Sequence, residues 1–386
     1  MQSRSAAPSG GGEGAYVLCC PDKFRGALEA HEAARALARG IRAGGLAARE
    51  HPLADGGEGT LDVVLRARPA RLVHRQVPDA LGAPVEGRIA LFPDRSAMVE
   101  LAEVAGLQRL APEARDVMGA SSAGVGMLVG AALDAGAERV IVALGGSATV
   151  DGGLGALRAL GARLLAAGGE ELHGRGRDLP RLERIDIAGL DPRLRGRLEL
   201  AADVSTPLHG PGGAAAMFGP QKGATPSEVA MLDAGLRRLE ALLGLRGPER
   251  LGAAGGFAAP FVAFCGARVR SGAALVRELT GFDRALEASF ACLTGEGRID
   301  AQSSHGKTVA GVAEAASRQG VPVFAVGGAV EDGAADLYRL GVSGIFGIAR
   351  RPLGLQEALA STRANLEWTA RAIAGALKLA LGGPSV

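Results

Sequence analysis

The chain has 386 residues, which is too long for one ordinary hydrophobic core, so the length predicts two domains. Hydrophobic residues make up 47% and charged residues 22%, a globular composition that can bury sizeable cores. A net charge of +2 without a block of like charges, together with only 3% aromatic residues, argues against a nucleic-acid partner. The 60 glycines cluster between apolar runs, where a backbone turns sharply or approaches a ligand.

The sequence also bears on the cellular compartment. No apolar segment reaches the roughly 18 residues that cross a bilayer. Residues 1–14 are polar and lack the hydrophobic stretch of a signal peptide, and we expect them and the final GGPSV to be flexible. The cysteines have no metal-ligand spacing and are expected to be buried free thiols: Cys19, Cys20, Cys265 and Cys292. We therefore expect a cytoplasmic protein without a membrane partner.

Short apolar runs alternate with amphipathic helical stretches along the chain. We expect strands at residues 16–20, 139–144, 197–201, 290–293, 321–326 and 344–348, and helices at residues 30–42 and 226–250. This rhythm is βα alternation, typical of an α/β protein with parallel strands. The N-terminal βαβ unit (17–52) and the last third (290–350) would supply five parallel strands to one open sheet, with the middle of the chain inserted between them.

Five segments combine glycine with charged residues just after apolar runs. Because ligands of open α/β sheets bind outside the carboxyl ends of the strands, we expect the five to converge. The first, PDKFRG, places Lys23 and Arg25 in a βα turn, which suits phosphate recognition or is a solvated loop.

The second segment is ADGGEGT. It carries two carboxylates, Asp55 and Glu58, on either side of Gly56 and Gly57. The glycines allow close approach to a ligand, and the carboxylates can hold Mg²⁺ or accept hydrogen bonds from a polyol. A surface turn is the alternative.

The third segment, LGGSATVDGG, follows a strongly apolar run. Its consecutive backbone N–H groups and its hydroxyls would form an anion-binding nest, with a structural glycine turn as the alternative. The candidate residues are Gly145, Gly146, Ser147, Thr149 and Asp151.

The fourth segment joins ADVSTPL to FGPQKGA. Asp203 ends a strand, a suitable place for a general base or a metal ligand. Gln221 and Lys222 lie between glycines, where the lysine could reach a phosphate. A capping aspartate and a surface lysine are the alternative.

The fifth segment is TGEGRIDAQSSHGKT. Its end resembles a P-loop with Ala in place of the first Gly, but seven residues separate that end from the strand. We therefore expect one long polar loop that precedes a helix. Its candidate residues are Gly295, Glu296, Arg298, Asp300 and Lys307.

The chemistry on offer is carboxylates, cations and glycine-rich turns. The six histidines share no metal spacing, and no G-x-S-x-G motif is present. Carboxylates, cations and backbone nests are the groups that phosphoryl transfer uses, because positioning and charge neutralisation account for most of its catalysis.

Six ordered motifs resemble the type I glycerate kinase family, the glycerate 2-kinases, from about residue 16 to about residue 380. They are PDKFRG, ADGGEGT, GGSATxDGG, DVxxPLxG with FGPQKGA, GAAGG, and TGEGRIDxQSxxGK. The chain departs from the family pattern where Met127 replaces an acidic residue and where Val150 and Thr206 replace Asn.

The resemblance implies ATP-dependent phosphorylation of D-glycerate to 2-phosphoglycerate with Mg²⁺. It also implies a flavodoxin-like domain from residues 15–62 and 284–386 and an inserted α/β domain from residues 63–283. We expect the third and fifth segments to hold the nucleotide phosphates. Lys23, Arg25 and Lys222 would bind the glycerate carboxylate or the transferring phosphoryl group.

Several roles stay open between candidates. Asp203 or Asp300 would orient or deprotonate the attacking hydroxyl, and Asp203 and Glu296 are candidate Mg²⁺ ligands. A kinase for another hydroxy or sugar acid, or a nucleotide-sensing module without turnover, is the alternative function. A homodimer is one of the oligomeric states left open.

Overall fold

The computed structural model describes residues 15–203, 206–245, 251–304 and 308–382, without the side chains of residues 302 and 304. Residues 1–14 and 383–386, which were expected to be flexible, lie outside the described residues, as does the candidate Lys307. The described chain divides into two units. The first extends to Leu53 and resumes at Gly281, and the second is Ala54–Thr280. The domain boundaries expected at 62/63 and 283/284 stay a prediction.

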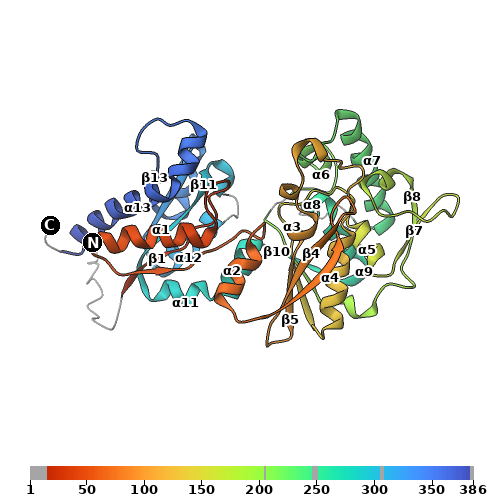
Figure 1. Ribbon diagram of the computed structural model, residues 1–386, viewed down its shortest axis with the longest axis horizontal. Coiled ribbons are helices and arrows are strands. Elements are labelled where there is room, and N and C mark those ends of the chain that lie inside the picture. The colour runs from red at the N-terminus through yellow and green to blue at the C-terminus, as the bar shows by residue number, and fades with distance from the viewer. Residues whose placement is uncertain (1–14, 204–205, 246–250, 305–307, 383–386) are drawn as a thin grey trace, which may run out of the picture. The chain divides into compact units, whose positions relative to one another are not determined.

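The first unit contains a parallel sheet built from both ends of the chain (Figure 1). The strand order is β13-β12-β11-β1-β2, and each neighbouring pair is parallel. Counted along the chain within this unit, the order is 2-1-3-4-5, the flavodoxin-like arrangement. The predicted α/β class and the five parallel strands from the two chain ends are confirmed. The strands are β1 (Tyr16–Cys19), β2 (Ala48–Glu50), β11 (Ser289–Ile299), β12 (Val323–Val330) and β13 (Val342–Gly347).

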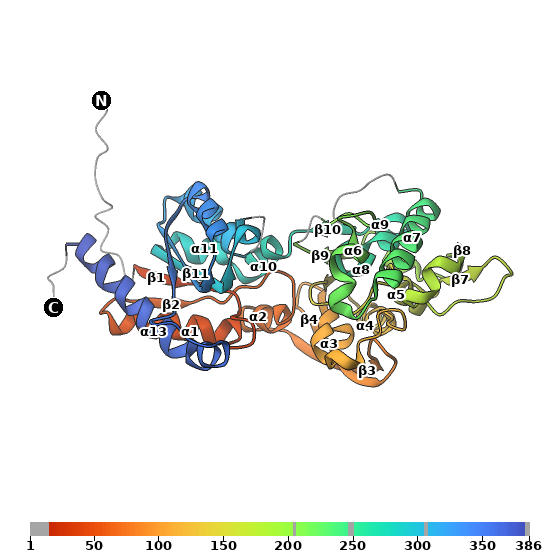
Figure 2. The same ribbon diagram turned by 90° about the horizontal axis from the view of Figure 1, so that it is seen from above.

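Two helices of the first unit lie side by side on one face of this sheet, as Figures 1 and 2 show for α1 and α13. Side chains alternate along a strand, so Val17 and Cys19 join the core beneath this helix pair. A Cβ atom on Gly40 would lie 2.2 Å from the Glu367 carbonyl oxygen, so glycine permits the helix contact. The helices are α1 (Ala30–Ala43), α11 (Phe282–Glu287), α12 (Thr308–Gln319) and α13 (Leu355–Ala380), with 3₁₀ turns η6 (Ala301–Ser304) and η7 (Asp332–Leu340).

The second unit contains a mixed six-stranded sheet of order β10-β9-β6-β5-β4-β3. Strands β5, β6, β9 and β10 are parallel, whereas β3, β4 and β5 pair antiparallel. A separate two-stranded ribbon joins β7 to β8 (Figure 2). The strands are β3 (Arg71–Pro78), β4 (Pro84–Leu91), β5 (Ser96–Glu100), β6 (Arg139–Ala143), β7 (Arg163–Ala166), β8 (Leu182–Asp186), β9 (Leu198–Ala201) and β10 (Arg268–Arg270).

The helices of the second unit follow sequence signals at their ends. Helix α7 begins after Thr225, whose hydroxyl accepts from the Glu228 N–H in a capping box, and it ends at Gly244 in the left-handed conformation. The predicted end at residue 250 was therefore too late. The helices are α2 (Thr60–Ala67), α3 (Leu101–Ala105), α4 (Ala123–Asp134), α5 (Leu154–Ala159), α6 (Ala214–Phe218), α7 (Pro226–Leu243), α8 (Ala253–Gly256), α9 (Ala258–Cys265) and α10 (Gly272–Thr280), with 3₁₀ turns η1 (Leu107–Arg109), η2 (Pro112–Ala114), η3 (Gly176–Arg181), η4 (Pro192–Leu194) and η5 (Pro220–Lys222).

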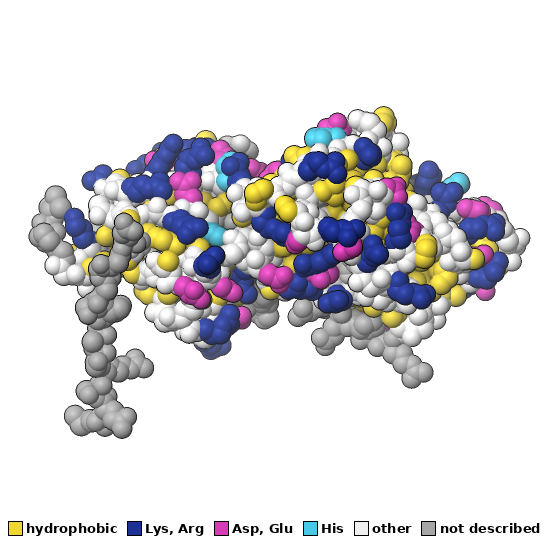
Figure 3. All heavy atoms as spheres, turned by 90° about the horizontal axis from the view of Figure 1, so that it is seen from below, with side chains coloured by type: hydrophobic (Ala, Val, Ile, Leu, Met, Phe, Trp, Pro, Cys, Tyr) yellow, Lys and Arg dark blue, Asp and Glu magenta, His cyan; other side chains and the backbone are white. Residues whose placement is uncertain are grey.

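The surface and the cysteines match the expectations from composition. Figure 3 shows Lys and Arg side chains spread over the face it draws, with acidic side chains among them. All four cysteines are free and buried, as predicted. None of the helices in the described ranges is both long enough and apolar enough to cross a membrane.

Candidate functional site

Glycine brings three segments of the second unit into backbone contact. Gly145 follows β6, and its N–H donates to the Gly56 carbonyl oxygen over 3.0 Å. A Cβ atom on Gly145 would lie 2.4 Å from the Gly57 Cα. A Cβ atom on Gly272, just after β10, would lie 2.2 Å from the Asp55 carbonyl oxygen. The ADGGEGT segment therefore packs directly against the carboxyl ends of two parallel strands.

Asp203 lies at the same edge, two residues after β9. Its Oδ1 accepts from the Ser271 hydroxyl at 2.7 Å, and its Oδ2 accepts from the Ala273 N–H at 2.7 Å. Burial raises the pKa of Asp203 to about 6, and the negative charge of Asp55 adds to the rise despite these hydrogen bonds. A carboxylate with its pKa near neutrality and spare lone pairs can take a proton from a hydroxyl.

A buried lysine, Lys222, holds the GGSAT segment through hydrogen bonds from the interior of the protein. The Lys222 ammonium donates to the Ser147 hydroxyl at 2.8 Å and to the Thr149 carbonyl oxygen at 2.7 Å. Lys222 is only 3% exposed, and burial lowers its pKa to about 7. The structure thus places Lys222 under the segment, and the surface lysine considered as an alternative is wrong.

The GGSAT backbone is only partly free to receive an anion. The Gly145 N–H is used by Gly56, and the Ala148 N–H donates to the Ala105 carbonyl oxygen at 2.8 Å. The Thr149 hydroxyl is buried without a hydrogen-bond partner among the described residues. The nest stays a prediction, in which the N–H groups of Gly145 and Ala148 already bond within the protein.

Asp151 is fully buried beneath this segment. Its carboxylate accepts from the Ser122 N–H and hydroxyl, both at 2.7 Å, and from the N–H groups of Gly153 at 3.1 Å and Gly155 at 3.3 Å. Burial raises its pKa. These bonds hold the start of α5. The Asp151 carboxylate is therefore hydrogen-bonded to other groups of the protein.

In the first unit, PDKFRG and the end of β11 form a second group of polar residues. The Asp22 carboxylate accepts from its neighbour Lys23 N–H at 2.6 Å and from the Thr308 hydroxyl, at the start of α12, at 2.7 Å. The Asp22 N–H donates to the Gly295 carbonyl oxygen at 2.8 Å. Arg25 is exposed on the following turn. The βα turn is thus tied to both β11 and α12.

The expectation of one long polar loop from residue 294 to residue 307 is wrong. Strand β11 continues to Ile299 and pairs with β12 throughout, from Thr294 opposite Ala325 to Ile299 opposite Val330. Glycine is needed here because a Cβ atom on Gly295 would lie 2.1 Å from the Val326 carbonyl oxygen.

Three candidates of the fifth segment are placed by this longer strand. The Ser303 hydroxyl donates to the Glu296 carboxylate at 2.7 Å, and the Asp300 N–H donates to the Ser303 hydroxyl at 3.2 Å, so η6 joins the two acids. Arg298 pairs with Glu331 at 3.3 Å on the surface.

Gln221, a candidate of the fourth segment in the second unit, is exposed. Its backbone carbonyl oxygen accepts a hydrogen bond from the Arg115 guanidinium.

The sequence did not single out three residues that the structure brings into these groups. Glu100 is the last residue of a short strand, Ser271 follows another, and Asp22 lies within PDKFRG beside the two cations that were chosen. A polar residue directly after an apolar run was the available signal for Glu100.

The side chains of the candidate site that could bind a metal ion are carboxylates. In the described part of the chain, no three His, Cys, Asp or Glu side chains cluster as a metal site requires. Mg²⁺, however, is commonly held by one or two carboxylates together with substrate phosphates. Asp55 lies near enough to Asp203 for its charge to raise the Asp203 pKa, so this acidic pair fits such an ion.

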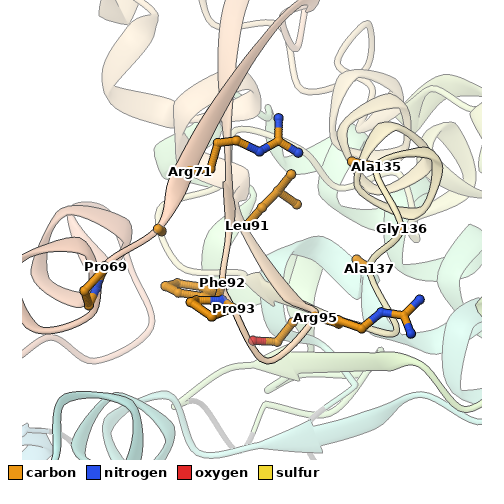
Figure 4. Close-up of a pocket in the computed structure, with 11 residues that line it drawn as sticks. Pro69, Arg71, Leu91, Phe92, Pro93, Arg95, Ala135, Gly136 and Ala137 are labelled. Carbon is orange, nitrogen blue, oxygen red and sulfur yellow. The ribbon is translucent and has the colours of Figure 1, made fainter.

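A pocket of about 600 Å³ lies elsewhere in the second unit (Figure 4). Its lining includes Leu91 at the end of β4, Ser96 at the start of β5 and Ala137 just before β6. Arg71 and Arg95 supply its cationic side chains, and no carboxylate lines it. Since β5 and β6 run from this end toward Glu100 and Gly145, the pocket is at the opposite end of the strands from the candidate site.

A model of the glycerate kinase family matches residues 17–378. A glycerate kinase from Bacillus subtilis (strain 168) is 40% identical over 374 residues, which cover 94% of this chain and 98% of that protein. The glycerate 2-kinase of Escherichia coli (strain K12) is 35% identical over 375 residues, covering 95% and 98%. A crystal structure from Salmonella typhimurium LT2, described provisionally as glycerate kinase 2, matches with a TM-score of 0.80 at 39% identity and covers 96% of this chain and 100% of that one.

Proposed function

We propose, from the premise that the chain belongs to the glycerate kinase family, that it transfers the γ-phosphoryl group of ATP to D-glycerate and releases 2-phosphoglycerate. The protein is a kinase that phosphorylates an alcohol group, and glycerate is the acceptor that its family and relatives name. The resemblance that the six motifs suggested is confirmed. ATP as donor, the D-enantiomer and the product with phosphate on carbon 2 are the finer parts of the proposal.

The observation that carries the proposal is the Asp203 carboxylate at the end of β9. Its Ser271 and Ala273 hydrogen bonds fix its orientation, and its pKa of about 6 leaves it ionised but still basic at neutral pH. Such a group can accept the proton of the attacking hydroxyl as the oxygen bonds to phosphorus. We assign this role to Asp203 and keep Asp300 as the alternative.

The binding roles follow the chemistry of each group of residues. Gly146 and Ser147, braced by Lys222, would hold phosphate oxygens, as would residues at the end of β11 such as Glu296 acting through Mg²⁺. Lys23 and Arg25 would bind the glycerate carboxylate or the transferring phosphoryl group as cations. Asp55 and Glu58 would receive hydrogen bonds from the hydroxyls of the acid.

Mg²⁺ would supply charge neutralisation at the phosphates when bound. Its candidate ligands are the acidic pair of Asp55 and Asp203 in the second unit or, as the alternative, Glu296 in the first. Asp203 can still contribute an oxygen lone pair to the ion, because a carboxylate has about four lone-pair sites and its bonds to Ser271, Ala273 and Gly272 do not use all of them.

A coupled assay of ADP release over a panel of hydroxy acids and sugar acids tests the function. D-glycerate should give the largest kcat/KM, and NMR of the product should place the phosphate on carbon 2. Turnover with another acid alone would replace the proposed substrate, and ATP binding without ADP release would replace the proposed reaction.

Variants of the two candidate bases test the mechanism in the same assay. Asp203→Asn should lower kcat by about 10²- to 10⁴-fold at saturating glycerate, the usual contribution of a general base. A comparable loss in Asp300→Asn with normal Asp203→Asn would move the role to Asp300. Near-normal kcat in both would remove the assignment.

Two further expectations belong to this proposal. We place the enzyme in the cytoplasm, because all four of its cysteines are free and buried, as in proteins of reducing compartments. A homodimer stays a prediction, which light scattering of the purified protein would check.

A further inference from the structure

Glu100, the last residue of β5, is a buried carboxylate at the edge of the sheet where the candidate site lies. It is 3% exposed. Its Oε1 accepts from the Gly59 N–H at 2.9 Å, and its Oε2 accepts from the Leu61 N–H at 2.9 Å. Both oxygens of one side chain thus hold the backbone of a segment about forty residues away in sequence.

The two N–H groups belong to the start of helix α2. The first N–H groups of a helix have no partner within the helix, and a buried donor left unpaired is costly. Gly59 is the N-cap residue of α2 and has no cap of its own, since glycine has no side chain and its φ is 88°. Glu100 therefore performs from β5 the capping that a local Ser or Asp would otherwise provide.

The same start of α2 is continuous with the ADGGEGT segment. The Thr60 hydroxyl donates to the Gly57 carbonyl oxygen at 2.6 Å, and the Gly57 N–H donates to the Asp55 carboxylate at 3.0 Å. Glu100 therefore holds the residues on either side of Thr60, and Thr60 connects through Gly57 to Asp55 by hydrogen bonds. Asp55 is also the residue whose charge reaches Asp203.

We propose that Glu100 is a positioning residue of the phosphoryl-transfer reaction, which holds the ADGGEGT segment, and Asp55 in particular, against the carboxyl end of the sheet. It touches backbone rather than ligand, so it acts through that segment. The inference rests on the proposed function, because it gives the segment a role in binding the acid. A purely structural cap would stabilise the fold without affecting how the acid is bound.

The second unit offers a matched control. Asp178 is also a buried carboxylate, 5% exposed, and its Oδ2 accepts from the N–H groups of His173 and Arg175, each at 3.1 Å. Its loop carries none of the candidate site residues. Glu100→Gln turns an NH₂ group toward one of its two backbone N–H groups, because each of them bonds a different oxygen. Asp178→Asn can keep its amide oxygen toward both of its N–H groups but loses the charge that strengthens the bonds. Both variants should therefore lower the melting temperature.

The two variants should differ in kinetics and in local amide exchange. Glu100→Gln should raise the KM for glycerate and lower kcat, reducing kcat/KM by about 10- to 100-fold, because small displacements of positioning groups carry penalties of that size. Its KM for ATP should stay unchanged. Hydrogen exchange should accelerate at the amides of Gly59 and Leu61. In Asp178→Asn the kinetic constants should stay at wild-type values, with faster exchange confined to residues 173–178.

Two results would overturn the proposal. One is an unchanged KM and kcat in a folded Glu100→Gln protein, and the other is an equal loss of activity in both variants. If Glu100→Gln does not fold, Glu100→Asp replaces it, since it keeps the charge and shortens the reach. Absence of glycerate phosphorylation by the wild type would instead refute the proposed function, while amide exchange would still report whether Glu100 holds the segment.

Discussion

The Lys222 ammonium lies 2.8 Å from the Ser147 hydroxyl, so a cation distant in sequence supports the GGSAT segment from inside the protein. A buried ammonium is costly unless its hydrogen bonds are satisfied. Here it also bonds the Thr149 carbonyl oxygen, and the charge of Asp151 partly offsets the effect of burial on its pKa. Lys222 therefore helps to hold the segment, together with the backbone hydrogen bonds of Gly145 and Ala148.

Replacing Lys222 by Met should impair catalysis through the segment. The substitution keeps the length of the side chain but leaves the Ser147 hydroxyl and the Thr149 carbonyl oxygen without their donor. We expect kcat/KM for glycerate phosphorylation to fall by about 10- to 100-fold, measured by ADP release. Lys378→Met, on helix α13, is the control for the chemistry of the substitution. Equal activity in both variants would show that the segment holds its position without Lys222.

The same lysine should make stability depend on pH. Burial lowers the pKa of Lys222 to about 7 in the folded protein. In the unfolded chain the pKa of a lysine is about 10.4. Between these values the unfolded chain binds more protons, so stability rises with pH. Denaturant titrations should show the free energy of unfolding of the wild type rising from neutral pH toward pH 10 relative to Lys222→Met. Parallel curves for the two proteins would contradict the lowered pKa.

Asp55 should shift the pH profile of the reaction. Burial is the main cause of the raised pKa of Asp203, about 6, and the charge of Asp55 adds to it. Asp55→Asn removes that charge, so the Asp203 pKa should fall and the acid limb of kcat/KM should move to lower pH. Asp116→Asn, which removes a surface carboxylate paired with Arg177, should leave the limb in place. An unmoved limb in Asp55→Asn would mean that Asp203 is not the titrating base.

Two glycine substitutions should have opposite outcomes. Gly145→Ala would place a Cβ atom 2.4 Å from the Gly57 Cα, and because both are backbone positions neither can move alone. We expect a loss of about 1–3 kcal/mol in the free energy of unfolding and reduced activity. Gly130→Ala, inside α4, would contact only Leu160 at 3.5 Å and should be neutral or stabilising by up to about 1 kcal/mol. Thermal unfolding of both proteins checks this contrast, and similar melting temperatures would refute it.

The strands that the sequence predicted are mostly apolar and buried, although it missed β5, whose five residues are all buried. The strand beginning at Tyr16 and the run from Arg139 are nearly continuous apolar stretches, as buried parallel strands are. Strand β3, with the sequence RLVHRQVP, lies at the edge of its sheet with most residues exposed, so it has no hydrophobic pattern to detect. The antiparallel half of the second sheet was therefore absent from the prediction.

Some features of the candidate site could likewise be predicted from the sequence, and others could not. That the GGSAT segment and Asp203 follow strands, and so lie at the carboxyl edge of the second sheet, is visible in the sequence because it depends only on chain order. The burial of Lys222 and Asp151 is not visible, since their partners Ser147 and Ser122 become neighbours only through tertiary packing. The continuation of β11 through Gly295 was hidden for a related reason, because a glycine required by a neighbouring strand looks in sequence like a loop glycine.

The chain passes from the first unit to the second at Leu53–Ala54 and returns at Thr280–Gly281. The two units therefore differ in how easily each can be produced on its own. The second can be encoded as one uninterrupted gene fragment, whereas the first requires an engineered joint between Leu53 and Gly281. A ribosome also completes the whole second unit before most of the parallel sheet of the first has been synthesised, so β1 and β2 must wait for their central partner β11.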